Sequence, residues 1–231
     1  MSKRALLLSL VFFVAAALGL WASLQFNGPA SPAAPALPET RAITLMHTPR
    51  TLPAFALQQS DGTPLTADEL KGHWTVVFLG FTHCPDVCPT TLAQLAGAQK
   101  QWAQVPEASR PRLLLVSADP ERDTPELLGK YAHAFHPDTL AATAPLPQLQ
   151  AFARSLSLVF MKVPNKSGPG TSGAPNDYSI DHSAALVLLD PQARMAGVAQ
   201  PPFDVNAIAA DLMTLTESNT VVPAKAGTHG R

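Results

Sequence analysis

The sequence has no surplus of positive charge. Its 231 residues include 16 lysines and arginines and 17 aspartates and glutamates, which gives a formal net charge of −1 and a pI near 6.6. A chain without a basic field does not gather phosphates, so we exclude nucleic acid as a partner. Its length, apart from the two ends, predicts one domain of roughly 150–170 residues with a core of its own.

Cysteine is scarce, and the two that are present stand close together. Cys84 and Cys88 lie between an apolar run, Thr75–Phe81, and a helix that we expect to begin near Pro89. No cysteine lies near residue 20, so we expect no lipid attachment there. Two thiols at a strand-to-helix junction can form a disulfide or hold a soft metal, and both point to function more than to packing.

One long stretch lacks charge altogether. It runs from Ala5 to Phe26 and follows Lys3 and Arg4. About 20 apolar residues cross a bilayer as a helix, and positive charges before them keep the N-terminus in the cytoplasm. A cleaved signal peptide is the alternative, although its apolar region is normally about 7–15 residues and no clean small-x-small site follows. We therefore predict a transmembrane helix over residues 1–26, with the rest of the chain on the oxidising side.

Prolines separate this helix from the domain. Residues 27–50 are predicted to form an extended linker, in which alanine and serine alternate with Pro29, Pro32, Pro35 and Pro38. We place the domain at residues 51–217 and a polar tail without an assigned role at 218–231. Gly, Pro, Ser and Asn are frequent over 164–178, which predicts a long loop.

Within the domain, apolar strands alternate with helices. The expected strands are Ala54–Leu57, Thr75–Phe81, Arg112–Ser117, Leu158–Val163, Ala184–Leu189 and Arg194–Ala199. The expected helices follow Thr66, begin near Pro89, and span Pro125–Phe135, Pro147–Ser157 and Asp204–Leu215. This alternation predicts an α/β fold with a central mixed sheet covered by helices. A cysteine pair on the first such strand-to-helix turn suggests a thioredoxin-like arrangement.

The spacing of Cys84 and Cys88 favours metal or redox chemistry over a structural disulfide. Positions i and i+4 share one face of a helix. The start of a helix stabilises thiolates, which serve both as nucleophiles and as metal ligands. A disulfide that closes so short a loop constrains the unfolded chain little, so stability is a weak reason for it.

A soft metal held by two thiolates needs a further donor, and imidazole is the usual choice. His182 lies between Asp181 and Ser183 at the start of an apolar strand. In a thioredoxin-like topology this strand entrance faces the cysteine turn, and Asp181 can orient the ring or adjust the local charge. A loop histidine without a ligand role stays an equal alternative at this point. The other six histidines are less well placed: His47, His73, His83, His133, His136 and His229.

Three segments together resemble a known family. They are Phe81-Thr82-His83-Cys84-Pro85-Asp86-Val87-Cys88-Pro89-Thr90-Thr91-Leu92, Asp119-Pro120-Glu121-Arg122-Asp123-Thr124-Pro125-Glu126 and Asp181-His182-Ser183-Ala184. Their order and spacing resemble the Sco/SenC family over roughly residues 52–216. Members of this family are membrane-anchored, thioredoxin-like copper proteins that help to build the CuA centre of cytochrome c oxidase.

The resemblance implies a ligand set, a location and a client. It transfers the family's copper ligands to Cys84, Cys88 and His182, with the two cysteines also serving as a redox disulfide, and the aspartate between the cysteines to Asp86. Cu(I) and Cu(II) are the implied cofactor states. The implied client is the CuA-bearing subunit of cytochrome c oxidase, with other periplasmic copper chaperones or thiol reductants as further partners. The protein is expected in the inner membrane, single-pass, with its domain on the periplasmic side.

These features predict a copper metallochaperone that is not an enzyme. The main alternative is a thiol–disulfide oxidoreductase, with Cys84 as nucleophile and Cys88 as resolving thiol. Enzymes of that class typically use a CxxC pair opposite a cis-proline, whereas the facing segment here offers His182 and Ser183. A copper-dependent redox sensor is a further alternative. A peroxidase is disfavoured, because the Pro-x-x-x-Thr/Ser-x-x-Cys pattern does not precede Cys84.

Overall fold

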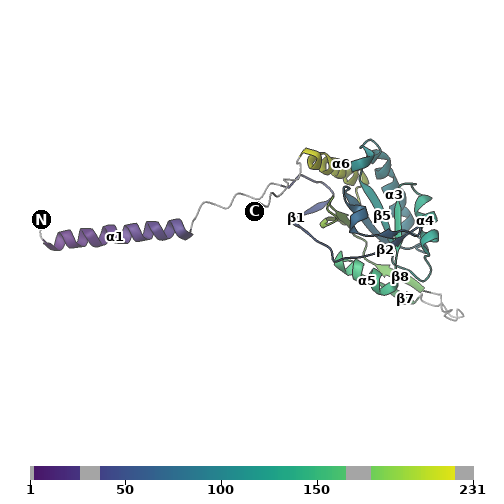
Figure 1. Cartoon of the computed structure of the whole chain (residues 1–231), viewed down its shortest axis with the longest axis horizontal. Coiled ribbons are helices and arrows are strands. Elements are labelled where there is room, and N and C mark those ends of the chain that lie inside the picture. The colour runs from purple at the N-terminus through teal and green to yellow at the C-terminus, as the bar shows by residue number, and fades with distance from the viewer. Residues whose placement is uncertain (1–2, 27–36, 165–177, 222–231) are drawn as a thin grey trace, which may run out of the picture. The chain divides into compact units, whose positions relative to one another are not determined.

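The computed structural model describes residues 3–26, 37–164 and 178–221, which fall into two separate units (Figure 1). The predicted long loop lies largely outside these ranges, as do residues 27–36 of the predicted linker, the end of the tail and His229. The first unit contains helix α1 (Lys3–Phe26), so the expected helix is confirmed. No helix among the described residues is long and apolar enough to cross a membrane, so the predicted transmembrane span is not confirmed.

The second unit is built on a mixed sheet of eight strands. In spatial order these are β1 (Thr44–Arg50), β10 (Met195–Ala199), β9 (Leu186–Leu189), β4 (Thr75–Gly80), β5 (Arg112–Ser117), β6 (Leu140–Thr143), β2 (Leu57–Gln59) and β3 (Pro64–Leu65). The pairs β4–β5 and β5–β6 are parallel, and the other pairs are antiparallel. Two further strands, β7 (Phe160–Pro164) and β8 (Tyr178–His182), pair antiparallel outside this sheet.

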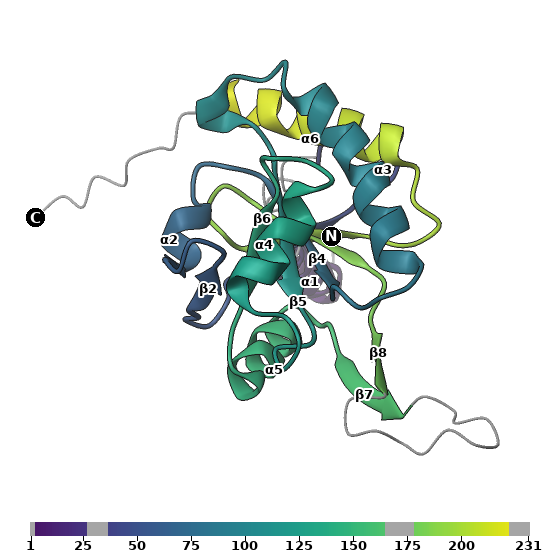
Figure 2. The ribbon, with the colours of Figure 1, turned by 90° about the vertical axis from the view of Figure 1, so that its right-hand side faces the viewer.

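Helices cover the sheet, as the sequence predicts. They are α2 (Ala67–Leu70), α3 (Val87–Trp102), α4 (Pro125–His133), α5 (Leu146–Ser155) and α6 (Val205–Val221), with a short 3-10 turn at Glu107–Ser109. Helices α3 and α6 lie side by side, and α4 packs over β6 and β2 (Figure 2). Every residue of β4 is buried, as expected for a central strand with a continuous apolar sequence.

Helices α2 and α4 begin where local sequence signals predict. Thr66 caps α2, and its own backbone N–H donates to the Glu69 carboxylate, which completes a capping box. Thr124 caps α4, and its hydroxyl accepts the N–H of Leu127 at 3.2 Å. Pro125 follows at the first helical position, where its missing N–H costs nothing.

Four strands, β1, β3, β6 and β8, lie where the sequence predicts none. Strand β1 falls inside the predicted linker but pairs with β10, so the folded unit begins before residue 51. Strand β6 is short and rich in alanine, which has little strand preference. Strand β8 overlaps the end of the predicted loop and holds His182 as its last residue. Each of these strands is defined by its partner in space rather than by its own sequence.

Candidate metal centre

The cysteine turn joins the end of β4 to the start of α3. The backbone N–H of Cys84 donates to the carbonyl of Phe81 at 3.3 Å, which closes the turn. Helix α3 begins at Val87, two residues before the expected start, so Cys88 lies within its first turn. Pro89 is accommodated there because the first N–H groups of a helix have no partner within the helix.

The two thiols are both free and differ in exposure. Cys84 is partly buried, whereas Cys88 is completely buried. The backbone N–H of Cys88 donates to the Cys84 sulfur at 3.3 Å, which ties this sulfur to the start of α3. Burial raises the pKa of the Cys88 thiol, so this group holds its proton in the metal-free protein. The pair therefore offers one accessible sulfur and one protected sulfur.

Gly80 creates the space that the buried sulfur occupies. A Cβ atom at this position would lie 3.2 Å from side-chain atoms of Leu115 and Phe78 and 3.3 Å from the Cys88 sulfur. These distances are tight for carbon contacts, so a side chain at this position would crowd the sulfur. Sequence reasoning missed this role of Gly80, because a glycine at a strand end is equally typical of a bulge or a sharp bend.

His182 reaches the cysteine turn from a distant part of the chain. Its Nε2 atom lies 3.7 Å from the Cys88 sulfur, although the two residues are 94 positions apart. Its Nδ1 atom lies 3.0 Å from the carbonyl of Ser183. Since a carbonyl only accepts, Nδ1 carries the proton and the Nε2 lone pair points toward the sulfur. The rings of Phe78 and Phe81 meet the imidazole edge to face, with centroids 6.4 and 6.0 Å away.

The separation of these two donor atoms matches that of two ligands on one metal. Bonds of about 2.3 Å to sulfur and about 2.0 Å to nitrogen, at an angle near 120°, place the two atoms about 3.7 Å apart. No group of three or more His, Cys, Asp or Glu side chains among the described residues is already arranged to hold a metal ion. The structure thus brings His182 against Cys88 and links Cys84 to the same turn. The three side chains do not yet form a complete set of metal ligands.

The other candidate residues do not complete the ligand set. Asp86 precedes α3 but makes no side-chain capping bond, and Asp86 and Asp181 are both exposed. His83 is exposed and lies with Nδ1 3.0 Å from the Thr82 hydroxyl. His73 is buried before the start of β4, where its Nδ1 contacts the carbonyl of Arg110 at 2.9 Å. The two aspartates can therefore influence charge near the site, while His73 belongs to the structural core.

Comparison with known proteins identifies the domain. A model of the SCO1/SenC family matches residues 44–217, which includes the cysteine turn, His182 and strand β1. The chain belongs to the SCO1/SenC family. This result confirms the resemblance seen in the sequence, and it places β1 inside the Sco domain rather than in a linker.

Individual Sco relatives and a solved structure agree with this assignment. A protein of Stutzerimonas stutzeri whose name refers to copper binding is 32% identical over 72% of this chain and 77% of its own length. The mitochondrial SCO1 homolog 1 of Arabidopsis thaliana is 33% identical over 67% of this chain, but the match spans only 43% of that protein. The copper-bound structure of Bradyrhizobium japonicum ScoI is 30% identical, with a TM-score of 0.60, and the match covers 70% of this chain and 97% of that chain.

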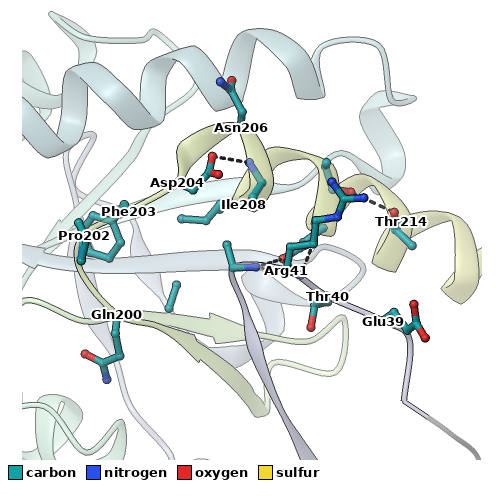
Figure 3. A pocket seen from close by; sticks show the side chains of 15 residues that line it. Glu39, Thr40, Arg41, Gln200, Pro202, Phe203, Asp204, Asn206, Ile208 and Thr214 are labelled. Atoms are coloured by element: carbon teal, nitrogen blue, oxygen red, sulfur yellow. Dashed lines mark hydrogen bonds between the residues drawn. The ribbon is translucent and has the colours of Figure 1, made fainter.

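A cavity of about 1050 Å³ in this Sco domain lies away from the cysteine turn (Figure 3). It is formed by residues 39–42, the end of β10 and helix α6, and none of its lining residues is a cysteine or a histidine. The buried carboxylate of Asp211 is satisfied there by the backbone N–H groups of Arg41, Ala42 and Ile43. Asp204 caps α6 by accepting the N–H of Ala207. These contacts fasten the start of the domain to α6.

Proposed function

We propose that this protein is a copper metallochaperone that holds copper through Cys84, Cys88 and His182. The observation that carries the proposal is the 3.7 Å contact between the Cys88 sulfur and the His182 Nε2 atom. A second sulfur, that of Cys84, is tied to the same helical turn. Membership of the SCO1/SenC family and the copper bound in a solved Sco relative support the same function.

The donor set suits copper in both of its common oxidation states. Cu(I) is a soft ion that accepts two thiolates and one imidazole. Cu(II) benefits more from the imidazole nitrogen, so His182 matters most for that state. The serine carbonyl that orients the His182 ring acts as the partner that ligating histidines usually have on their second nitrogen.

The difference between the two thiols sets an order of loading. Because Cys84 is partly exposed, an incoming copper ion meets its sulfur first. Cys88 is buried, its pKa is raised by burial, and it gives up its proton only as the metal arrives. Loading therefore releases protons, and the accessible Cys84 side is where a recipient protein exchanges ligands. Such a role is transfer of cargo and needs no catalytic turnover.

The client in this proposal is the CuA-bearing subunit of cytochrome c oxidase. Other periplasmic copper chaperones or thiol reductants are further partners, as donors of copper or electrons. We propose that the domain lies on the periplasmic side of the inner membrane and that the N-terminal segment attaches it there. Fractionation of cells, followed by alkaline extraction of the membranes, tests this location. Recovery of the full chain in the alkaline supernatant would contradict membrane insertion.

The test of copper binding is an anaerobic titration of the reduced full chain with Cu(I) against a chelator of known affinity. We expect one tightly bound copper per chain. His182→Ala should weaken binding by at least about 100-fold, more than the loss of a ligand's hydrogen-bond partner does, and should lose the Cu(II) form first. The control is His133→Ala, which removes an exposed histidine of α4. Unchanged copper binding in His182→Ala would contradict the ligand assignment.

A thiol–disulfide reductase is the second candidate function. Its specific support is the asymmetry of the pair, because Cys84 is accessible and receives an N–H bond while Cys88 is buried. This arrangement suits a nucleophile and a resolving thiol. Absence of competitive copper binding by the wild-type chain, together with reduction of a disulfide in the client subunit, would favour this function over the first.

A further inference from the structure

The two halves of the candidate copper site stand on different parts of the fold. The cysteine turn follows β4, which is hydrogen-bonded on both sides within the main sheet. His182 ends β8, which pairs only with β7 in a separate ribbon (Figure 2). The hydrogen bonds of the main sheet therefore constrain His182 only through the three residues that join β8 to β9. Other contacts must hold the β7–β8 ribbon in place.

The segment Asp119–Thr124, between β5 and α4, contacts the cysteine side through Asp123. This carboxylate is almost fully buried. It accepts the backbone N–H of Thr82 at 3.1 Å, the hydroxyl of Thr82, and the hydroxyl of Ser117 at 2.7 Å. Thr82 lies two positions before Cys84. A buried carboxylate with three donors holds the start of the cysteine turn firmly.

The same segment contacts the histidine side through Asp119 and Arg122. The fully buried Asp119 accepts the hydroxyl of Tyr178 at 2.7 Å and the Nε–H of Arg122. Arg122 donates from Nη1 to the carbonyl of Tyr178 at 3.1 Å, and its guanidinium carbon lies 3.9 Å from the centre of the Tyr178 ring. Tyr178 begins β8, four positions before His182. Three different contacts thus hold the base of the strand that carries the ligand.

The two sets of contacts are joined into one unit. The backbone N–H groups of Arg122 and Asp123 both donate to the carbonyl of Asp119, at 3.2 and 2.9 Å, so the three side chains project from one tight turn. The Arg122 guanidinium also lies 5.9 Å from the centre of the Phe81 ring, which in turn packs against the His182 imidazole. This one turn therefore makes direct contacts with both halves of the site.

We propose that Asp119, Arg122 and Asp123 are positioning residues that set the distance between the cysteine pair and His182. They act as a bracket, with one arm on Thr82 and the other on Tyr178. The inference rests on the proposed copper function, since it concerns the geometry of the same site. An exposed ion pair between Lys162 and Glu121 spans the same gap to the ribbon, but surface pairs of this kind contribute little.

The experiment compares Arg122→Gln in the wild-type and His182→Ala backgrounds of the full chain. Alone, Arg122→Gln should weaken copper binding by about 10–100-fold and reduce the nitrogen couplings in the Cu(II) electron paramagnetic resonance spectrum. In the His182→Ala background it should have almost no further effect, because the group that it positions is gone. An equal loss in both backgrounds would show general disruption and would overturn the proposal.

Two more variants control this comparison. Tyr178→Phe removes only the hydroxyl that Asp119 accepts, and it should show a smaller effect of the same kind if Arg122→Gln fails to fold. Glu121→Gln changes the exposed ion pair of the same segment and should leave copper binding unchanged. Wild-type copper binding in both Arg122→Gln and Tyr178→Phe would overturn the proposal.

A measurement without copper separates this inference from the proposed function. Because the rings of Phe78 and Phe81 lie edge to face with the His182 imidazole, their ring currents should shift its proton resonances in the metal-free protein. Arg122→Gln should move these resonances toward the values of an unpacked histidine. If the wild-type chain binds no copper, the proposed function fails, while this shift still tests the bracket. Unchanged resonances in the folded variant would overturn it.

Discussion

The cysteine turn and the β7–β8 ribbon supply the two halves of one candidate site, yet they are built very differently. The cysteine turn follows the fully buried strand β4 at the centre of the main sheet. The ribbon stands outside that sheet, and Val159 just before it and Met161 within it are exposed. A site of this kind has one rigid half and one half whose position depends on a few side-chain contacts. Changes in the first half should affect stability and metal binding together, whereas changes in the second should affect mainly the metal.

The largest effect should come from the cysteines themselves. Cys84→Ala or Cys88→Ala should abolish tight Cu(I) binding, because one thiolate and one imidazole make a poor Cu(I) site. Competition with a chelator under anaerobic conditions measures this. Circular dichroism of each variant confirms that the fold persists. Affinity close to that of the wild type in either variant would mean that copper binds elsewhere.

Gly80→Ala tests how rigid the cysteine half is. The added methyl group must displace Leu115, Phe78 or the Cys88 sulfur, and such overpacking typically costs about 1–3 kcal/mol of unfolding free energy. Chemical denaturation gives this value, and copper affinity should fall in parallel. Gly97→Ala is the matched control, because a Cβ there meets no atom within 4 Å and alanine favours the interior of α3 by about 1 kcal/mol. Equal stability of the two variants would show that the space around Cys88 is not tight.

Ser183→Ala tests how independent the ribbon is. The Ser183 hydroxyl accepts the N–H of Val159 at 3.0 Å and faces its carbonyl at 3.3 Å, so its loss should cost about 1 kcal/mol locally. We expect faster hydrogen exchange in β7 and β8 without a matching increase in β4 and β5. Mass spectrometry of the exchanged protein resolves these strands. A uniform increase across the domain would show that the ribbon and the sheet open as one unit.

The smallest expected effect is on the pH dependence of stability. It comes from His73, which lies just before β4, at the end remote from the cysteines. Burial lowers the pKa of His73 below its usual value of about 6.5, so the unfolded chain takes up the proton at a higher pH than the folded domain does. His73 therefore favours folding above pH 6.5, and this contribution is lost as the pH falls through the folded-state pKa. His73→Gln should flatten this part of the stability curve between about pH 7 and pH 5 in denaturant titrations. An identical pH dependence in the variant would assign the acid sensitivity to other groups.

Sequence reasoning worked best where the signal was local. The central strands β4 and β5 follow from continuous apolar runs, and α2 and α4 begin at the caps formed by Thr66 and Thr124. It failed for β1 and β6, whose own sequences carry weak strand signals. Strand β8 could have been predicted from the sequence, because apolar Tyr178 and Ile180 alternate with polar residues and are the buried positions of the strand.

For the site, the sequence by itself determined which residues have suitable chemistry. It supplied two cysteines at the start of a helix and a histidine in a segment that resembles the Sco/SenC family, because thiol spacing and short motifs are local properties. Only the tertiary structure decided that His182 meets Cys88 across 94 positions and that Asp119 reaches Tyr178 across 59. Such contacts depend on how β7 and β8 pack beside the main sheet. Packing is a property of the whole fold. Each buried donor or carboxylate forms its hydrogen bonds with the groups that the folded core brings close to it.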